Sequence, residues 1–587
     1  MKINWWFPLI AIFILGFLLR FVYLGSLPFP INGDEAAHGY NSWSIAHFGT
    51  DEFGNSFPLY FPSAGDYKYP VYNYLSAPFV AIFGMNDFMT RFLSALSGVL
   101  LIGVIYKLTE LLTNERRTAL IAALFTAISP WSLIYSRTAS LSNVALFLAT
   151  TGIYFVVSGL LDHKRIVKNL AIAGLFFLIA IFTHQSARVF IPGFLGLLSL
   201  YIIFNRKAKD FSPVWKKLLV FGVMIIVLTG ASLIPWESRA RAEGLSVFNN
   251  SAGREKLMTE TAREMGLGDP VPPIVTRIFF NKLTLLGWEI GGRYLSHFSP
   301  NYLFIQGDIV QLNSVPNMGV LYVLDGLFLL IGLALFITKP TFPRMILLFI
   351  LLASPLPAAA SIETPSAQRQ VIGLAGFVIT VAIGLSFLLD NIKNKGYLKH
   401  LVIFLIVGGY LYFFSFFLVN FFKVKAVHQP YGSDQGYQEM VEYVWQEKGN
   451  YDKVVMPVSP YIHFLYRKQI PPQDFLSRAE IIPTSVQQWD RVKSLDNIIF
   501  NMQSNCPKIG RENVLYVCKG LEIPRNAKVL KVVRFGDLIP AFTMLKFEAL
   551  PVEKQAKEEL PFMLNYMVEG DARYPTGVFA KEENRYW

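Results

Sequence analysis

Three charged side chains in the polar segment after the first apolar run have types and a spacing suited to chemistry. Asp34 and Glu35 are adjacent carboxylates, and Lys68 follows between two tyrosines, within residues 31–70. Charged side chains beside a membrane span are costly unless they have a task or a partner. A carboxylate can take a proton from a hydroxyl, and an ammonium can stabilise a phosphate. We therefore predict that Asp34 is a catalytic base and that Lys68 holds a lipid phosphate.

Each of these residues also has a structural interpretation. Asp34 follows a glycine and precedes EAAHGY, so it can be a helix N-cap, which contributes about 0.5–2 kcal/mol. Glu35 can orient a substrate or pair with an arginine. Lys68 can be an ordinary boundary lysine, because such lysines are common at interfaces. A second acidic pair, Asp51 and Glu52, is flanked by glycines and is more typical of a turn.

The composition indicates a membrane protein. Of 587 residues, 53% are hydrophobic and 16% are charged, whereas a soluble domain has roughly 25% charged residues. The net charge of +12 comes from Lys and Arg that fall mostly in short gaps between apolar runs. That placement orients a protein in a membrane and is not the clustered basic surface of a nucleic-acid-binding domain. We therefore expect the lipid bilayer as a partner, and no nucleic acid.

Eleven apolar runs indicate the helices that must position these side chains. A span needs about 20 residues to cross a bilayer of about 30 Å. The first run, 5–22, can also be a signal peptide, but no small-residue cleavage site follows it, so we expect a retained helix. The other runs are 88–106, 119–134, 144–161, 170–182, 189–204, 218–234, 318–337, 345–358, 371–389 and 401–422. The predicted fold is a polytopic α-helical membrane protein of about eleven spans, over residues 1–422.

The charges of the connecting loops predict the orientation of the spans. One alternate set of short connections carries nearly all the cations, which are Lys107, Arg116, Arg117, Lys164, Arg165, Lys168, Arg206, Lys207, Lys209, Lys216, Lys217, Lys339, Arg344, Lys393, Lys395 and Lys399. Because Lys and Arg are retained on the cytoplasmic side, this set and the N terminus are predicted to be cytoplasmic. The loops 26–87 and 236–316 and the tail from 423 then lie outside, and we expect the protein in the plasma membrane.

Three arginines remain on the outer side, each at a helix end. They are Arg137, Arg188 and Arg369, in IYSRTAS, THQSARVF and PSAQRQV. They can snorkel to lipid headgroups, as boundary arginines commonly do. Three together, against the prevailing charge bias, favour an anionic ligand on the same side as Asp34. His184, close to Arg188, is a further candidate for substrate contact.

The two outer loops are expected to be structured. Residues 34–48 predict a short interfacial helix with Tyr40, Trp43 and Phe48 available to face lipid, and a second short amphipathic segment follows Lys68. The loop 236–316 contains an aromatic, glycine-rich stretch that predicts a cover over the site.

Two residues of that second loop are candidates for substrate contact. Arg293 can reach a phosphate or be solvated. His297 can contact substrate, although a hydrogen-bonded structural histidine is the more common case. The nearby acids are Asp34, Glu35, Asp66, Glu289 and Asp308. Carboxylates can bind Mg²⁺ or Mn²⁺, but nothing here fixes a ligand spacing, so no catalytic metal is predicted.

The composition changes after Lys423. YQEMVEYVWQEKGN has helical spacing, while YDKVVMPVS, ENVLYVCK, AKVLKVVRF and PAFTMLKFE are typical of strands. We predict a soluble extracytoplasmic α/β domain over 423–587, either for acceptor binding or as a scaffold. Its residues Cys506 and Cys518 are the two cysteines of the chain and can form a disulfide outside the cytoplasm, but spacing alone does not decide this.

The pattern around Asp34 resembles a known family. An apolar span is followed by an outer-loop Asp-Glu pair, expected interfacial helices, a lysine shortly before a proline, and then SPWSLIYSRTASLSNVALFL. This resembles the polyprenyl-phosphate-dependent glycosyltransferases of the GT-C superfamily. Within it, the most similar branch contains the dolichyl-phosphate-mannose protein mannosyltransferases and the lipid A aminoarabinose transferase. The resemblance extends over the helical region to about residue 422.

The resemblance implies an inverting transfer of a hexose or pentose from a polyprenyl-phosphate donor to a protein, lipid or glycan acceptor on the outer side. The loop acid matching Asp34 is the expected base, and Lys68 with the arginines would stabilise the departing phosphate. One base suffices for a direct displacement, unlike the two carboxylates of hydrolases. No cofactor is implied for this branch. Oligosaccharyltransferases of the superfamily use a divalent ion, but we do not predict one here.

Other classes of membrane protein remain as alternatives. A transporter or flippase of a lipid-linked or anionic substrate would place charges or broken helices near the middle of the membrane. A receptor could use the tail for binding but would not need Asp34 and Lys68 together. The conspicuous charges of this chain lie at one membrane edge, which favours the enzyme.

Overall fold

All eleven predicted apolar runs are helical in the structure. The computed structural model describes residues 5–63, 66–207, 212–239, 281–428, 433–456, 459–482, 492–500, 506–507, 510–520, 523 and 526–547. The helices of the bundle are α1 (Trp6–Phe21), α4 (Asp87–Thr113), α5 (Arg116–Ile128), α6 (Pro130–Ser136), α7 (Leu141–Leu161), α8 (Ile166–Ile181), α9 (Gln185–Phe204), α10 (Trp215–Ala231), α15 (Val323–Thr338), α16 (Phe342–Ala353), α17 (Leu356–Ala359), α18 (Ala367–Gln370), α19 (Leu374–Ile392) and α20 (Tyr397–Val419).

The predicted number of spans is not confirmed. Within the described residues, six helical segments are long and apolar enough to cross a membrane, or up to seven if α5 and α6, which are bent by 52°, form one span. Helices α1 and α15 are apolar but shorter. Several of the predicted runs are thus helices that fall below the length of a full span.

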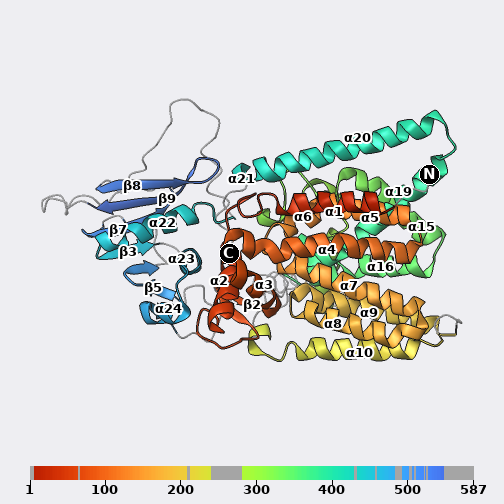
Figure 1. Cartoon of the computed structure of the whole chain (residues 1–587), viewed down its shortest axis with the longest axis horizontal. Coiled ribbons are helices and arrows are strands. Elements are labelled where there is room, and N and C mark those ends of the chain that lie inside the picture. Colours follow the sequence, from red (N-terminus) through yellow and green to blue (C-terminus); the bar gives the residue numbers. More distant parts are fainter. Residues whose placement is uncertain are drawn as a thin grey trace, which may run out of the picture.

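The helices run back and forth between two ends of the bundle (Figure 1). One end carries α2, α3 and the C-terminal sheet, and the other end carries the connections that are rich in Lys and Arg. Helix α4, with 27 residues, runs from the first end to the second and is about 40 Å long at 1.5 Å per residue. The side chains of the two ends are therefore separated by the thickness of the bundle.

A buried arginine stabilises the break between α5 and α6. Pro130 has no N–H, so the carbonyl of Thr126 loses its helical partner there. The Arg20 guanidinium donates to the carbonyls of Thr126 and Ala127, at 3.0 Å each, and to the Ser132 hydroxyl at 2.7 Å. The bend in this span is thus satisfied internally, as a membrane interior requires.

The first outer loop folds as predicted into two short helices, joined by a hairpin. Its elements are α2 (Gly33–Phe48), β1 (Phe61–Ser63), β2 (Asp66–Lys68) and α3 (Pro70–Phe83). The predicted turn at residues 51–52 is present, because the Asp51 carboxylate accepts from the backbone N–H groups of Phe53 and Asn55, both at 2.9 Å.

The structure excludes the alternative interpretation of Asp34 as the N-cap of α2, and it differs from the expectation that Tyr40 is available to lipid. The N-cap of α2 is Asn32, which forms a capping box with Glu35, so Asp34 is a first-turn residue and not the cap. Tyr40 does not face lipid, because it is fully buried and donates from its hydroxyl to the Ile470 carbonyl at 2.6 Å. Tyr40 and Trp43 instead pack against residues of the C-terminal domain, whereas Phe48 is 44% exposed.

The second outer loop and the tail supply the remaining elements. They are α14 (Lys282–Ser296), η6 (Asn420–Val424), α21 (Lys425–His428), α22 (Tyr437–Glu447), α23 (Tyr461–Lys468), α24 (Pro472–Arg478), β3 (Lys453–Met456), β4 (Ala479–Ile481), β5 (Val492–Leu495), β6 (Ile498–Phe500), β7 (Val514–Lys519), β8 (Ala527–Arg534) and β9 (Pro540–Phe547). The strands form one mixed sheet in the order β4-β5-β6-β3-β7-β9-β8, and a disulfide joins Cys506 to Cys518. The predicted helix at 437–447 and the four predicted strands are all present.

Candidate active site

Asp34 and Lys68 are in contact although they lie on different elements. Asp34 is in the first turn of α2, and Lys68 is the last residue of β2, where it pairs with Phe61 across the hairpin. The Lys68 ammonium donates to the Asp34 carboxylate and lies 3.6 Å from Asp66. The Asp34 side chain is 69% exposed, whereas that of Lys68 is 6% exposed. Asp34 is therefore an ionic, solvent-accessible carboxylate held at the positive end of a helix, which suits a general base.

Glu35 has the opposite environment. Its two carboxylate oxygens accept from the Arg91 guanidinium, both at 2.7 Å, and one also accepts from the Ala139 N–H at 2.8 Å. Arg91 in turn donates to the carbonyls of Leu24 and Phe29. This pair is buried and joins the first loop to α4 and to the start of α7. Of the two roles considered for Glu35, the geometry favours pairing with an arginine.

Arg188 lies beside the segment that carries Lys68. Its guanidinium stacks 4.6 Å from the ring centroid of Tyr69 and donates to the Tyr60 hydroxyl at 2.8 Å and to the Ser238 hydroxyl. His184 is the N-cap of the same helix, α9, and is buried with its Nδ1 2.7 Å from the Ser186 hydroxyl. Arg188 thus contacts Tyr69, the residue that follows Lys68. The Arg188 side chain is buried, so it does not extend to the lipid headgroups.

Arg137 binds backbone carbonyls at the C-terminal end of α1. It is fully buried, donates to the carbonyls of Leu19 at 2.7 Å and Val22 at 2.9 Å, and lies 4.7 Å from the ring centroid of Phe422. The Arg137 guanidinium therefore does not extend to the lipid headgroups, and it does not face an open site for an anion. Arg137 joins α1 to the end of the last bundle helix.

The other three predicted residues gather around the segment 361–370. Arg293 pairs with Glu289 at 2.7 Å and donates to the Ser361 carbonyl at 2.7 Å, and Arg369 pairs with Glu363 at 3.0 Å. His297 is buried between two backbone groups, with Nδ1 2.8 Å from the Arg293 carbonyl and Nε2 accepting from the Ser366 N–H at 3.0 Å.

Burial lowers the pKa of His297 to about 4, so its ring is neutral. The contacts fit the structural histidine that was considered as an alternative. Of the residues proposed as substrate contacts, the structure brings Lys68 to Asp34 and Arg188 close to that pair, whereas Arg293, His297 and Arg369 stabilise a second segment.

The C-terminal domain stabilises α2 through contacts that no sequence pattern indicated. Asp434 accepts from the Gly33 N–H at 2.7 Å, one residue before Asp34. Glu52 is fully buried and accepts from the hydroxyls of Tyr461 and Ser63, both at 2.7 Å. These contacts join α2, its loop and the domain around the candidate base. The Gly-flanked acid pair gave no signal for this role, because a turn explains the same residues.

Burial raises the pKa of Glu52 to about 7. The hydroxyl donors and the Asn41 amide, which lies 3.0 Å away, oppose this rise without cancelling it. Glu52 is thus a buried acid with a pKa of about 7, and it lies between the first loop and the C-terminal domain.

The chemistry of the donor set does not fit a metal centre. Among the described residues, no group of three or more His, Cys, Asp or Glu side chains is arranged to hold an ion. The space between Asp34 and Asp66 is taken by the Lys68 ammonium. We therefore derive no step that uses a metal.

Comparison with solved structures identifies the class of fold. ArnT from Cupriavidus metallidurans bound to undecaprenyl phosphate matches with a TM-score of 0.50 and 12% identity, over 93% of this chain and 98% of that chain. The Archaeoglobus fulgidus oligosaccharyltransferase in complex with Zn and sulfate matches with a TM-score of 0.50 and 14% identity, over 78% of this chain. The chain spans about three fifths of that oligosaccharyltransferase, whose matched share is 61%. The fold is helical and GT-C-like, with a C-terminal sheet domain.

A family comparison narrows this class. Residues 67–233 match the model of the dolichyl-phosphate-mannose-protein mannosyltransferase family, a stretch that begins one residue before Lys68 and includes Arg188. No curated protein matches the chain by sequence. The predicted resemblance to GT-C glycosyltransferases, in the branch of the mannosyltransferases and ArnT, is confirmed.

Proposed function

We propose that this protein is an inverting glycosyltransferase of the plasma membrane, which moves a hexose or pentose from a polyprenyl phosphate to a protein, lipid or glycan acceptor on the outer face. The observation that carries the proposal is the contact between the exposed Asp34 carboxylate and the buried Lys68 ammonium at one end of a GT-C-like bundle. The undecaprenyl phosphate named with ArnT supports a lipid-phosphate donor.

Asp34 acts as the base in one displacement. The acceptor oxygen forms a bond to the anomeric carbon while its proton passes to an Asp34 carboxylate oxygen. The bond from that carbon to the phosphate oxygen breaks, and its electron pair leaves with the polyprenyl phosphate. Because a hydroxyl is a weak nucleophile, removal of its proton in the transition state contributes about 10²–10⁴-fold. A single attack from the face opposite the phosphate inverts the configuration.

Lys68 stabilises the phosphate as charge develops on it. An ammonium has three N–H donors, so it can hold Asp34 and a phosphate oxygen together. Its burial strengthens the interaction with an anion, since less water screens the charge. Arg188 acts through Tyr69, against which it stacks, and is a positioning residue for the Lys68 segment.

A transporter or flippase is less well supported by the contacts of the bundle. The bend between α5 and α6 is a broken span of the kind that can form an ion site. The carbonyls freed there already accept from Arg20. The exposed acid Asp34 lies instead at one end of the bundle.

Incubation of the purified protein with a panel of polyprenyl-phosphate sugars tests the proposal. We expect one donor to be consumed, and NMR of the product to show an anomeric configuration opposite to that of the donor. D34N should slow consumption about 10²–10⁴-fold, while D66N, which removes the other acid beside Lys68, should retain most of the activity. A product with retained configuration, or turnover in D34N near that of the wild type, would overturn the mechanism.

A further inference from the structure

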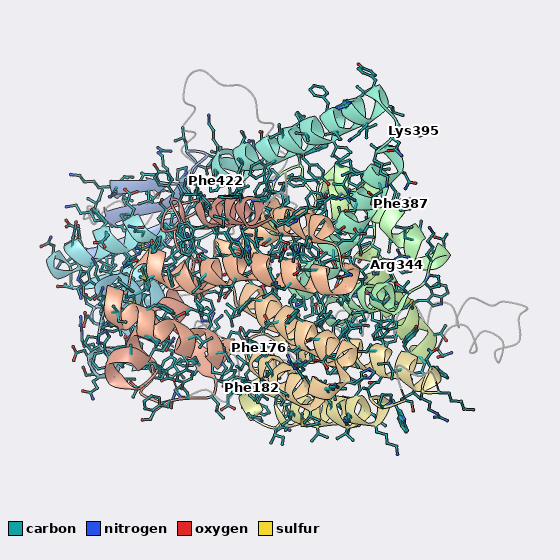
Figure 2. The ribbon with its side chains drawn as sticks, turned by 45° about the vertical axis from the view of Figure 1, so that its right-hand side comes forward. Phe176, Phe182, Arg344, Phe387, Lys395 and Phe422 are labelled. Atoms are coloured by element: carbon teal, nitrogen blue, oxygen red, sulfur yellow. A yellow bond between two sulfur atoms is a disulfide. The ribbon has the colours of Figure 1, made fainter. Side chains whose placement is uncertain are left out.

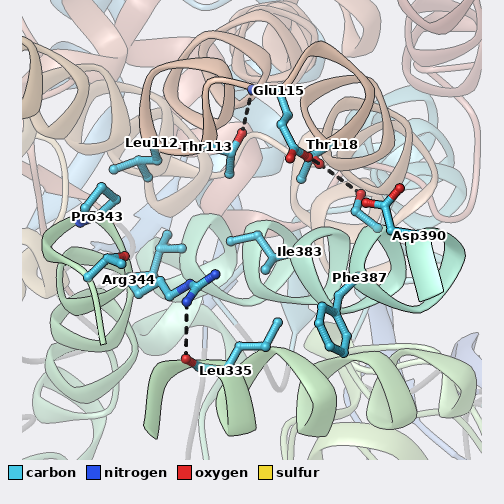
Figure 3. Close-up of a pocket in the computed structure, with 13 residues that line it drawn as sticks. Leu112, Thr113, Glu115, Thr118, Leu335, Pro343, Arg344, Ile383, Phe387 and Asp390 are labelled. Atoms are coloured by element: carbon cyan, nitrogen blue, oxygen red, sulfur yellow. Dashed lines mark hydrogen bonds between the residues drawn. The ribbon is translucent and has the colours of Figure 1, made fainter. Parts of the chain in front are cut away.

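A cavity of about 280 Å³ lies at the end of the bundle opposite to Asp34. Its walls come from the end of α4, the start of α5, the connection from α15 to α16, and the last turns of α19 (Figure 3). Figure 2 shows Arg344, Phe387 and Lys395 at this end and Phe422 toward the other. At about 30 Å³ per molecule, the cavity has room for about nine waters, which also suits a phospholipid headgroup.

The two sides of the cavity carry opposite charges that are not paired with each other. Arg344 directs its guanidinium into the space, and its described partners are the backbone carbonyls of Leu335, at 3.5 Å, and Lys339, at 2.5 Å (Figure 3). Across the cavity, the Glu115 carboxylate accepts from the Thr118 hydroxyl at 2.8 Å. Among the described ion pairs, neither Arg344 nor Glu115 has an oppositely charged side chain within 4.0 Å.

The neighbouring acid is already neutralised. Asp390 forms a two-point pair with Arg117, at 2.7 and 3.1 Å, so it contributes little net charge to the cavity. A ligand that satisfies both remaining groups must present a cation to Glu115 and an anion to Arg344. A hydroxyl beside Glu115 favours a cation with N–H donors, since these can also bond to Thr118.

The remaining lining is mixed and belongs to the bundle helices and their connections. Leu112, Leu335, Leu347 and Ile383 line the cavity together with hydroxyls of Thr113, Thr341 and Ser386. Phe387, also in its wall, is 39% exposed. The surrounding loops carry the cations that predict the cytoplasmic membrane surface. The exposed ring of Phe387, on a helix of the bundle, can lie against an acyl chain, which a soluble zwitterion does not have.

We propose that this cavity binds the headgroup of a phospholipid that has a primary ammonium and a phosphate, with the phosphate on Arg344 and the ammonium on Glu115. The site is independent of the sugar-transfer chemistry, because about 40 Å of helix α4 separates the two ends. Through this site the bundle binds one class of phospholipid headgroup in preference to others with the same acyl chains.

Native mass spectrometry of the full chain, equilibrated with lipids of identical acyl chains, tests this proposal. Phosphatidylethanolamine should be retained in preference to phosphatidylcholine, whose trimethylammonium has no N–H, and to phosphatidylglycerol, which has no cation. R344Q and E115Q should each lower retention of phosphatidylethanolamine about tenfold, as expected for the loss of one charge-assisted contact. R344K keeps the charge and should retain more lipid than R344Q.

Matched controls separate this site from general charge effects. E110Q changes an acid at the same end that pairs with Lys107 and Arg116 outside the cavity, and it should leave retention unchanged. Soluble phosphoethanolamine at the same concentration should not displace the lipid; displacement would overturn the lipid as the source of the group. Equal retention of the three lipids, or no response to R344Q and E115Q, would overturn the site itself.

Discussion

Asp34 and Glu35 are neighbours in the chain, yet their environments differ completely. The Asp34 side chain is 69% exposed and touches a lysine of the hairpin, whereas the Glu35 side chain is 5% exposed and locked to Arg91 by two bonds of 2.7 Å. The difference follows from the helix. Successive residues point about 100° apart at 3.6 residues per turn, so one acid faces the open end and the other faces the bundle.

Under the proposed function, this contrast separates an acid that acts on the substrate, Asp34, from an acid that stabilises the fold, Glu35. A buried ion pair is costly to break because the remaining charge is left without a partner. Neutralising an exposed carboxylate changes the free energy of unfolding of the protein little. An exposed carboxylate is also accessible to a substrate. Under the proposed function, the same two-residue motif therefore supplies the base from one position and a stabilising ion pair from the next.

The largest expected effect is the loss of catalysis in D34N. Turnover should fall about 10²–10⁴-fold because the amide cannot accept the acceptor's proton. The free energy of unfolding should stay close to that of the wild type, since the Asp34 side chain is exposed and the buried Lys68 ammonium keeps Asp66 as a partner at 3.6 Å. Single-turnover kinetics and denaturant unfolding of the purified protein measure the two quantities. A stability loss in D34N as large as that of a Glu35 variant would remove the contrast.

Replacement of its neighbour should have the reverse pattern. E35Q should lower the free energy of unfolding by about 3–5 kcal/mol, because Arg91 is left charged and buried. Turnover per folded molecule should change little. Addition of R91M to E35Q should recover part of the lost stability, and no recovery in the double variant would contradict the account.

Glu52 is a third acid for this comparison. It is fully buried and takes part in no ion pair among the described residues. Its folded pKa is raised from 4.5 to about 7, so the folded state holds the proton more tightly than the unfolded chain. Stability should therefore be highest below pH 4.5, fall by up to about 3 kcal/mol as the pH rises to 7, and then stay level. Unfolding curves between pH 4.5 and 8 measure this. E52Q should flatten the slope, and an unchanged slope would exclude Glu52 as its source.

The smallest expected effect is that of replacing Lys68, the cation in contact with Asp34. K68A should raise the KM for the donor about tenfold, because one charge-assisted contact to the phosphate is lost, and should also lower kcat, because charge develops on that phosphate during the transfer. The KM for the acceptor should change less. K68R keeps the charge and should fall between K68A and the wild type. Equal shifts in both KM values would argue against a phosphate contact.

The sequence predicted the bundle and the outer-loop elements better than the partners of single residues. Apolar runs and the periodicity of 437–447 report burial directly, so these helices and the four strands were found. The placement of Lys68 beside Asp34 depends on a hairpin that no local pattern specifies. Arg137, Arg188 and Arg369 were interpreted as an anion site because a sequence does not display their partners. These are backbone carbonyls for Arg137, an aromatic ring and hydroxyls for Arg188, and the Glu363 carboxylate for Arg369.

The bond from Gly33 to Asp434 spans 401 residues of chain. A newly made polypeptide can therefore begin α2 with its own capping box, but the contact to Asp434 forms only after the C-terminal domain has been synthesised and folded. The surroundings of Asp34 are thus completed late in the biogenesis of the chain.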